Sequence, residues 1–161
     1  MDIRPERADD AADIGDVIVR AFGRADEARL VAELREAGDA AISLVAVEGG
    51  AVTGHILLSP VAAPFRALAL APLAVAPERQ KQGVGAALIK AANAQARREG
   101  WDAVFVLGDP AYYGRFGFRG DLAAGFESAF AGVHFMVLPL TDGLPATEGR
   151  LDYALAFGNL T

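Results

Sequence analysis

Hydrophobic residues recur at every third or fourth position near the start of the chain, and this spacing predicts two helices. The first repeat covers residues 14–22, and aspartates gather just before it, where the helix dipole favours acidic side chains. A second repeat covers residues 30–34 and ends near Gly38. A short strand is expected near Ile3, ahead of both helices.

Continuous apolar runs in the middle of the chain predict strands. The runs Ile42 to Glu48 and Ala51 to Leu58 flank Gly49-Gly50, which is a strong signal for a hairpin turn. The run Ala67 to Val75 also has strand character. Because Pro72 cannot donate a hydrogen bond to a neighbouring strand, this strand should be bulged or split near that residue.

A strand, a loop, a helix and another strand follow in order, which is typical of a right-handed β-α-β unit. The loop after Val75 contains glycines, the helix runs to about Glu99, and the next strand covers Ala103 to Leu107. Asp109 then begins a short helix as its N-cap, with Pro110 at the first helical position.

Two further strands are expected, around His134 to Leu140, with His134 itself a strand residue, and around Leu151 to Phe157. The elements together predict an α/β fold with a mixed sheet. The 161 residues contain no internal repeat and no long linker, so they predict a single domain over residues 1–161.

Composition narrows the classes of function. The chain has no cysteine, which excludes disulfides, thiolate-bound zinc and a cysteine nucleophile, and its two histidines are too isolated to suggest a metal site. The longest apolar stretch, Val61 to Ala76, is too short and too interrupted to span a membrane. Without a signal-peptide pattern, a cytoplasmic location is expected.

The net charge of −6 argues against nucleic acid or an anionic membrane as the main partner. The sign of the charge nevertheless changes along the chain. Residues 61–100 carry six basic and two acidic side chains, whereas the segments on either side are acidic. A basic centre of this kind could hold an anionic ligand, or the pattern could be accidental.

The loop from Arg79 to Ala86 carries the clearest chemical signal. Gly83 and Gly85 let a strand pass directly into a helix, so that backbone N–H groups at the positive end of the helix can bind phosphate or pyrophosphate. The Walker pattern is absent, and Leu88 stands where a dinucleotide-binding loop has its third glycine. The remaining interpretation without a ligand is an ordinary tight turn into a helix.

The spacing Gln80-x-x-Gly83-x-Gly85 resembles the GNAT superfamily of acyl-CoA-dependent N-acyltransferases. A bacterial branch of predicted small acetyltransferases is similar in further passages, namely Gly54 to Val61, Pro72 to Pro77, Val106 to Phe118 and Gly149 to Phe157. The resemblance implies a GNAT-type mixed, mostly antiparallel central sheet that is splayed at a β-bulge and flanked by helices.

The resemblance also implies acetyl-CoA as the acyl donor, with no metal. The backbone of Leu73, Ala74 and Val75 would pair with the pantetheine, and the Leu73 N–H would polarise the thioester carbonyl. The pyrophosphate would lie in a cradle formed by Gln80, Lys81, Gln82, Gly83, Val84, Gly85 and Ala86. Three basic side chains could pair with phosphates of the donor or form a solvated basic face: Arg79, Lys81 and Arg115.

Tyr113 is the general acid that the resemblance implies, because it lies four residues before Gly117-Phe118. A phenol suits the protonation of a thiolate at neutral pH. Its neighbour Tyr112 is expected to pack. The general base is open among His55, Asp109 and water, since no acid occurs in the two strands where many relatives carry one. Without a cysteine or a serine-hydrolase motif, direct attack by the amine is the simplest mechanism.

The acceptor is expected to be a small-molecule amine or a protein amino group. Asp26, Glu27 and Glu33 could favour a cationic amine, or they could simply solvate a helical surface. The alternative function is a non-catalytic acyl-CoA-binding sensor or regulatory module, and binding of nicotinamide or flavin is a weaker third. A homodimer is compatible with the sequence.

Overall fold

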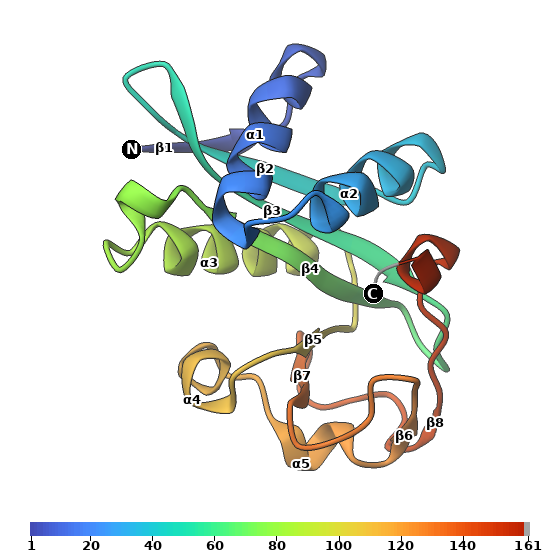
Figure 1. Ribbon diagram of the computed structural model, residues 1–161. Coiled ribbons are helices and arrows are strands. Elements are labelled where there is room, and N and C mark those ends of the chain that lie inside the picture. The colour runs from blue at the N-terminus through green and yellow to red at the C-terminus, as the bar shows by residue number, and fades with distance from the viewer. Residues whose placement is uncertain (160–161) are drawn as a thin grey trace.

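A six-stranded sheet lies at the centre of the computed structural model, which describes residues 1–159 (Figure 1). The strands lie in the order β1-β2-β3-β4-β5-β7, and every neighbouring pair is antiparallel except β4 and β5. They are β1 (Asp2–Pro5), β2 (Ile42–Glu48), β3 (Ala51–Val61), β4 (Ala67–Val75), β5 (Ala103–Leu107) and β7 (Phe135–Pro139). The sheet is therefore mixed and mostly antiparallel, as expected.

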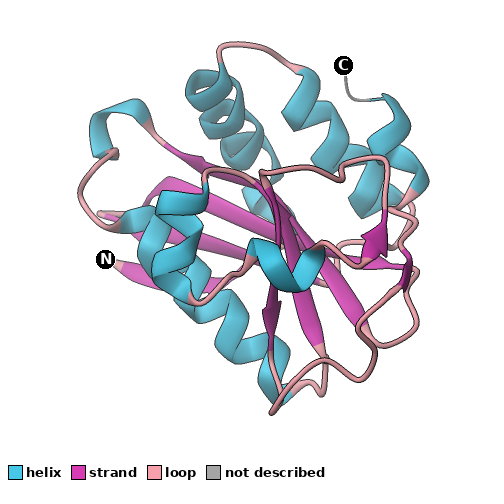
Figure 2. Cartoon of the chain, turned by 90° about the horizontal axis from the view of Figure 1, so that it is seen from below, coloured by secondary structure: helices cyan, strands magenta, loops and turns pink. Residues whose placement is uncertain are grey.

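Helices cover both faces of the sheet (Figure 2). On one face lie α1 (Ala11–Phe22) and α2 (Asp26–Glu36), and on the other lies α3 (Val84–Arg98). The remaining elements are short: α4 (Pro110–Tyr113), α5 (Gly120–Ala123), β6 (Phe126–Glu127), β8 (Gly149–Arg150) and 3-10 turns at Ala8–Asp10, Pro77–Arg79, Gly114–Phe116 and Leu155–Asn159. No helix within residues 1–159 is long and apolar enough to cross a membrane.

Alternation along the strands produces two separate core layers. Ile56 of β3 packs against Leu88 and Ile89 of α3, whereas its neighbour Leu57 packs in the layer beneath α1 and α2. Successive side chains of a strand point to opposite faces, so β3, in the middle of the sheet, contributes to both layers. The burial of Ile14 within α1 shows that the predicted helical repeat is the face that meets the sheet.

A bulge in β4 changes the shape of the sheet. Ile56 pairs with Leu73 and Leu58 pairs with Leu70, so the single residue between them on β3 faces two residues on β4, Ala71 and Pro72. The parallel pairing of β4 with β5 ends at Leu70. Beyond the bulge, β4 continues along β3 alone and leaves one backbone edge open, which confirms the predicted irregularity at Pro72.

The C-terminal segment differs from the prediction. Of its described residues, only Gly149–Arg150 forms a ladder. Asp152 makes a single bridge to Ala62, and Leu155–Asn159 is a 3-10 turn, so the strand expected over Leu151 to Phe157 is wrong. Leu151 packs in a cluster with residues of β4 and β5, whereas Phe157 packs under α1 and α2. Because the apolar side chains fill two separate parts of the core, the segment crosses the end of the sheet and does not join it.

His134 was also expected within a strand, and this expectation is wrong. The residue is exposed and immediately precedes β7, and its carbonyl accepts a hydrogen bond of 2.9 Å from the Gly108 N–H. The helices and the other strands agree with the sequence to within a few residues, and β3 extends to Val61.

Candidate functional site

The loop between β4 and α3 presents unsatisfied backbone donors. Gly83 has a φ of 88° and caps α3, and the first bond of the helix runs from the Ala87 N–H to the Gly83 carbonyl. The N–H groups of Val84, Gly85 and Ala86 precede that bond and have no acceptor within the helix. Three aligned donors at the positive end of a 15-residue helix form a suitable site for an anion.

The open edge of β4 presents further backbone groups next to this loop. The Ala76 N–H donates to the Thr53 carbonyl of β3. Alternate residues of a strand direct their backbone groups to opposite sides, so Ala74 faces β3 and both Leu73 and Val75 face away from it. On that side β5 has already diverged, and the Val75 carbonyl accepts a hydrogen bond from the Gln80 side chain.

A cavity of about 480 Å³ joins the open edge to the loop. Its walls include residues of both segments that the sequence predicted to bind the donor: Leu73, Val75, Gln80, Lys81, Gly83, Val84, Gly85 and Ala86. Arg79, Lys81 and Arg115 all line it as well. Arg79 is held by an ion pair of 2.6 Å to Glu48, and the Arg115 guanidinium lies over the Tyr112 ring. Three basic side chains therefore surround the loop, and Glu48 and Tyr112 hold two of them in place.

Ala74 and Gln82, two further residues expected to contact the donor, are outside the described lining of this cavity. Ala74 is buried in the layer under α1 and α2, which agrees with its backbone facing β3. The Gln82 side chain donates to the Glu78 carbonyl and thereby braces the loop. Ala74 therefore anchors the strand in the core, and Gln82 stabilises the loop.

Tyr112 lines the same cavity, although only a packing role was expected for it. Its ring packs edge-on against Tyr113 and Phe116, as expected. Its hydroxyl oxygen, however, lies so close to α3 that a Cβ at Gly85 would be 2.9 Å from it. Glycine at position 85 therefore makes room for the Tyr112 hydroxyl at the start of the helix.

A second cavity, of about 300 Å³, lies on the other side of Leu73. Leu73 and Phe22 line both cavities, and Tyr113 lines only this one. Its remaining walls come from the bulge of β4, the end of β5, α2 and the C-terminal segment. The two residues expected to take part in catalysis, Leu73 and Tyr113, thus meet at one cavity. We call the larger cavity the loop cavity and the smaller one the bulge cavity.

The environment of Tyr113 keeps its hydroxyl protonated. Burial raises the pKa of Tyr113 to about 12, and Tyr112 makes a smaller contribution in the same direction. The ring packs edge-on against Phe118, and a Cβ at Gly108 would overlap it. Its position is therefore fixed by the packing of α4 against the end of β5.

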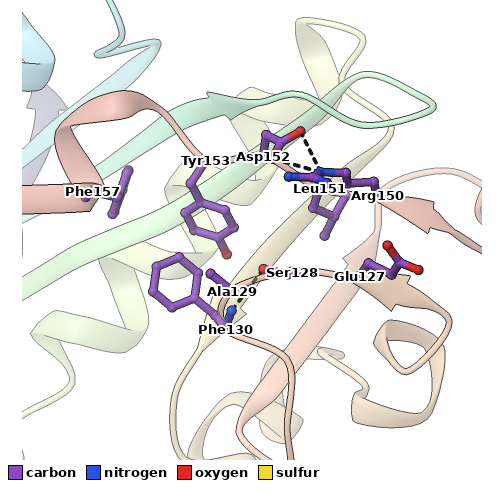
Figure 3. Close-up of a pocket in the computed structure, with 10 residues that line it drawn as sticks. Glu127, Ser128, Ala129, Phe130, Arg150, Leu151, Asp152, Tyr153 and Phe157 are labelled. Atoms are coloured by element: carbon purple, nitrogen blue, oxygen red, sulfur yellow. Dashed lines mark hydrogen bonds and ion pairs between the residues drawn. The ribbon is translucent and has the colours of Figure 1, made fainter.

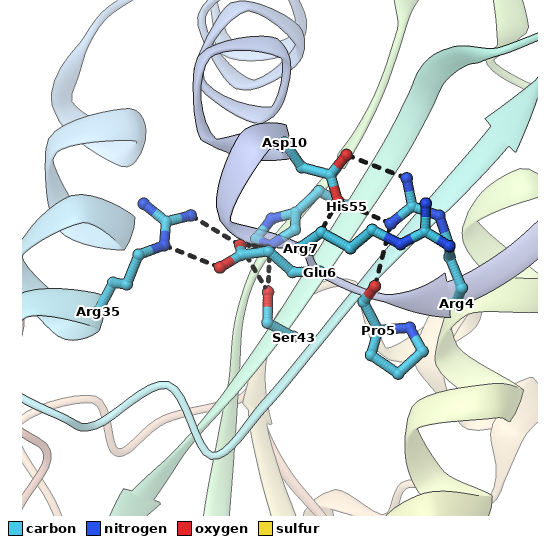
Figure 4. A network of polar contacts seen from close by, with 8 residues as sticks. All are labelled: Arg4, Pro5, Glu6, Arg7, Asp10, Arg35, Ser43 and His55. Carbon is cyan, nitrogen blue, oxygen red and sulfur yellow. Dashed lines mark hydrogen bonds and ion pairs between the residues drawn. The ribbon is translucent and has the colours of Figure 1, made fainter.

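His55, an expected base candidate, belongs to a buried network on the opposite side of the sheet from α3 (Figure 4). Its Nε2 lies 2.8 Å from the Ser43 hydroxyl and 3.8 Å from a Glu6 carboxylate oxygen, and Arg35 donates two hydrogen bonds to Glu6. Burial lowers the pKa of His55 to about 4. This neutral, enclosed imidazole is outside the described lining of both cavities, and its role is structural.

Asp109, the other base candidate, also has a structural role. Its side chain accepts a hydrogen bond of 3.0 Å from the Ala111 N–H and caps α4, as predicted. It is outside the described lining of both cavities. Asp109 therefore fixes α4, on which Tyr113 stands.

Glu27 is an acid whose role the sequence left open. Together with Asp26 and Glu33 it was expected either to favour a cationic amine or to solvate a helical surface, and the structure shows that it is 5% exposed and lines the bulge cavity. Arg24 holds both of its carboxylate oxygens, with a distance of 2.9 Å from its Nε to Oε1. The sequence signal was weak because an acid in the first turn of a helix is ordinarily explained by the helix dipole.

A third cavity, of about 380 Å³, adjoins the C-terminal segment (Figure 3). Phe130, Tyr153 and Phe157 line both this cavity and the bulge cavity. Its other walls carry exposed charges, among them Arg150 in an ion pair with Asp152. Among residues 1–159, no group of three or more histidine, aspartate and glutamate side chains is placed to hold a metal ion.

The chain is similar in sequence and in structure to proteins already described. Residues 39–120 match the family model described as an acetyltransferase (GNAT) domain. The Escherichia coli protein YhbS, named as an uncharacterized N-acetyltransferase, is 37% identical over 95% of this chain and 96% of its own. Its crystal structure in complex with CoA has a TM-score of 0.91 at 33% identity and covers 97% of this chain and 91% of that one.

Two further proteins similar to this chain are also named as acetyltransferases. The E. coli protein YjhQ, likewise named as an uncharacterized N-acetyltransferase, is 45% identical over 68% of this chain, and the match spans 65% of YjhQ. A GNAT family acetyltransferase from Brucella melitensis, crystallised in complex with acetyl-CoA, has a TM-score of 0.82 and 36% identity over 97% of both chains.

Proposed function

Because the chain belongs to the GNAT family of acetyltransferases, we propose that it transfers the acetyl group of acetyl-CoA to a primary amine by direct attack on the thioester. The observation that carries this proposal is the junction at Leu73, where the loop cavity and the bulge cavity meet at the open edge of β4. A donor lying along that edge has its diphosphate at one end and its reactive carbon at the other.

The residues present suit the donor. The N–H groups at the start of α3 and the cations Arg79, Lys81 and Arg115 match a diphosphate. The outward-facing backbone groups of Leu73 and Val75 match the amides of a pantetheine arm, which would lie beside β4 as an added strand. The complexes of YhbS with CoA and of the Brucella enzyme with acetyl-CoA support this assignment.

The donor supplies an activated acetyl group, and the side chains of the bulge cavity organise its transfer. The acceptor nitrogen forms a bond to the acetyl carbon as the bond from carbon to sulfur breaks. The Leu73 N–H faces the open edge and donates to the acetyl oxygen as negative charge develops there. The acceptor releases one proton to solvent water, because His55 and Asp109 lie outside the described lining of both cavities.

Tyr113 donates its hydroxyl proton to the departing sulfur and regains a proton from solvent. Burial makes Tyr113 a weaker acid than a free phenol. A thiolate in the same cavity is destabilised by the same loss of solvation, so its affinity for the proton rises as well. The low polarity of the cavity therefore raises the proton affinity of the Tyr113 oxygen and that of the departing sulfur alike.

The test is to incubate the full chain with acetyl-CoA and a panel of primary amines, with thiol release and mass spectrometry of the acceptor as readouts. Stoichiometric thiol and N-acetylated acceptor are expected. Leu155→Ala serves as a matched control, since Leu155 is 95% exposed and lines none of the three cavities described above. Tight binding of acetyl-CoA without thiol release across the panel would contradict the proposal and indicate a sensor of acyl-CoA.

A further inference from the structure

Aromatic and aliphatic side chains dominate the bulge cavity. Five of its twelve lining residues are aromatic, and six others are aliphatic or proline. Two of the apolar residues at its edge are unusually exposed, Phe22 at 42% and Leu107 at 50%. An apolar cavity with large apolar side chains at its edge suits a ligand with an apolar surface.

Glu27 is the remaining lining residue and the one carboxylate among the described residues of this wall. It projects from the start of α2 into a surface that is otherwise free of charge. Arg24 binds each carboxylate oxygen, and each oxygen retains a second lone pair that can accept another hydrogen bond. The cavity therefore offers one fixed acceptor for the N–H groups of an amine.

Ring contacts shape the wall opposite the bulge. The Tyr153 ring lies 4.7 Å from the Phe130 ring and 5.2 Å from the Phe157 ring, measured between centroids. In Figure 3 the Tyr153 side chain projects from the C-terminal segment towards the segment that carries Phe130. The Tyr153 hydroxyl is buried and makes no hydrogen bond within residues 1–159, so this ring contributes mainly apolar surface to the wall.

We propose that the bulge cavity selects a primary amine carried on a flat, apolar body, such as an arylalkylamine, with the nitrogen at Glu27 and the body against the aromatic wall. This proposal rests on the proposed function, because the same amine would be the acetyl acceptor. A cavity of about 300 Å³ is at the small end of ligand sites, which span roughly 300–1,000 Å³, so it suits a compact acceptor.

Strongly hydrated acceptors match this cavity poorly. A polyamine or an amino sugar would bring several ammonium or hydroxyl groups into a wall whose polar side chains are Glu27, Tyr113 and Tyr153, and the Tyr153 hydroxyl is buried. Each additional group would lose its water without a replacement hydrogen bond. An aryl ring loses little by leaving water and gains contact with the exposed edges of Phe22 and Leu107.

The experiment compares three acceptors of matched reactivity in the presence of acetyl-CoA: 2-phenylethylamine, ethanolamine and a lysine-containing peptide. Phenylethylamine is expected to show a kcat/KM about tenfold or more above that of ethanolamine, from burial of its ring. Equal or better use of ethanolamine or of the peptide would overturn the inference, while leaving acetyl transfer itself intact.

Two variants identify the residues responsible. Leu107→Ala is expected to raise the KM for phenylethylamine severalfold and to leave the KM for ethanolamine unchanged. Leu155→Ala, at an exposed leucine outside the cavity, is expected to change neither KM. Glu27→Gln is expected to weaken the binding of phenylethylamine about tenfold and to leave unchanged the binding of 2-phenylethanol, which lacks the amine. An equal loss of affinity for both compounds would overturn the role of Glu27.

Calorimetry separates this inference from the proposed function. With CoA-saturated protein, phenylethylamine is expected to bind more tightly than ethanolamine whether or not turnover follows. If no amine is acetylated but this order of affinities holds, the proposed function fails and the selectivity of the cavity stands. If acetylation occurs and the order is reversed, the proposed function stands and the inference fails.

Discussion

Tyr112 and Tyr113 are adjacent in the sequence, yet their side chains line different cavities. α4 turns by about 100° per residue, so neighbouring residues point in different directions. Tyr112 lies against the start of α3 at Gly85, and Tyr113 lines the bulge cavity. The proposed roles in donor binding and in proton transfer therefore fall on different side chains and can be tested separately.

Replacing Tyr113 by phenylalanine removes the proposed proton donor and preserves the ring. We expect Tyr113→Phe to lower kcat by about 100-fold, the lower end of general acid catalysis, and to change the affinity for acetyl-CoA little. Tyr112→Phe should instead act on the KM for acetyl-CoA. Steady-state kinetics of the two variants measures the split, and a Tyr113→Phe enzyme with unchanged kcat would show that the hydroxyl is not the acid.

The raised pKa of Tyr113 also sets the pH dependence of the rate. Its hydroxyl stays protonated until the pH approaches about 12, so the rate should rise as the amine loses its proton and then stay level through pH 10. A fall in kcat below pH 10 that disappears in Tyr113→Phe would contradict this environment for the residue.

His55 should make the stability of the fold depend on pH. The unfolded chain takes up a proton at this residue as the pH falls through about 6.5, whereas the folded chain does so only near 4. Because the unfolded state then binds more protons, the free energy of unfolding should fall by about 3 kcal/mol between pH 7 and pH 4.

Glu6 in the same network adds to the loss of folding stability at lower pH. Burial raises its pKa, but hydrogen bonds from Arg35 and Ser43 lower it by more, so the net direction is downward and stability is lost as the carboxylate protonates. Urea unfolding at several pH values tests the account. His55→Gln should remove most of the slope between pH 7 and pH 4, and His134→Gln, at an exposed histidine, should retain it; equal slopes in wild type and His55→Gln would rule the account out.

At the scale of elements, the extra residue in β4 is the feature that creates the site. With Ala71 and Pro72 both opposite Leu57, β4 leaves β5 after Leu70 and opens the edge at Leu73. Deleting Pro72 would restore one-to-one pairing and keep Leu73 opposite Ile56. β4 could then continue beside β5 and close the edge.

We therefore expect deletion of Pro72 to leave the chain folded and to weaken acetyl-CoA binding at least about tenfold. Pro72→Ala, which keeps the extra residue, should bind acetyl-CoA nearly as the wild type does. Thermal melting tests whether each variant is folded, and calorimetry measures its affinity for acetyl-CoA. Wild-type affinity in the deletion variant would show that the bulge is not required for the donor site.

The bulge and the turn into α3 were predictable because each depends on one residue type with a fixed backbone chemistry. Pro72 lacks an N–H, and Gly83 tolerates a φ of 88°. The buried position of Glu27 and the 3-10 turn over Leu155–Asn159 were not predictable. Both depend on contacts between α2 and the C-terminal segment, which are more than a hundred residues apart in the sequence and leave no local periodicity.

Over the whole molecule, the basic residues at the loop cavity are not the same set as the basic residues of the central segment. Of the basic residues in the central segment, Arg79 and Lys81 line the loop cavity, whereas Lys90 and both arginines near the end of α3 lie outside its described lining. Arg115, from the acidic C-terminal third, completes the basic set. A protein of net charge −6 thus places three basic side chains around one helix end, where they would bind an anionic donor.

An NMR titration of the ¹⁵N-labelled chain with acetyl-CoA would locate the donor on the protein. We expect acetyl-CoA to shift the amide signals at the open edge and the helix start, those of Leu73, Val75, Val84, Gly85 and Ala86, with His55 and its surroundings unchanged. Shifts confined to the cavity beside Arg150 and Asp152, with Leu73 and Gly85 unaffected, would contradict this expectation.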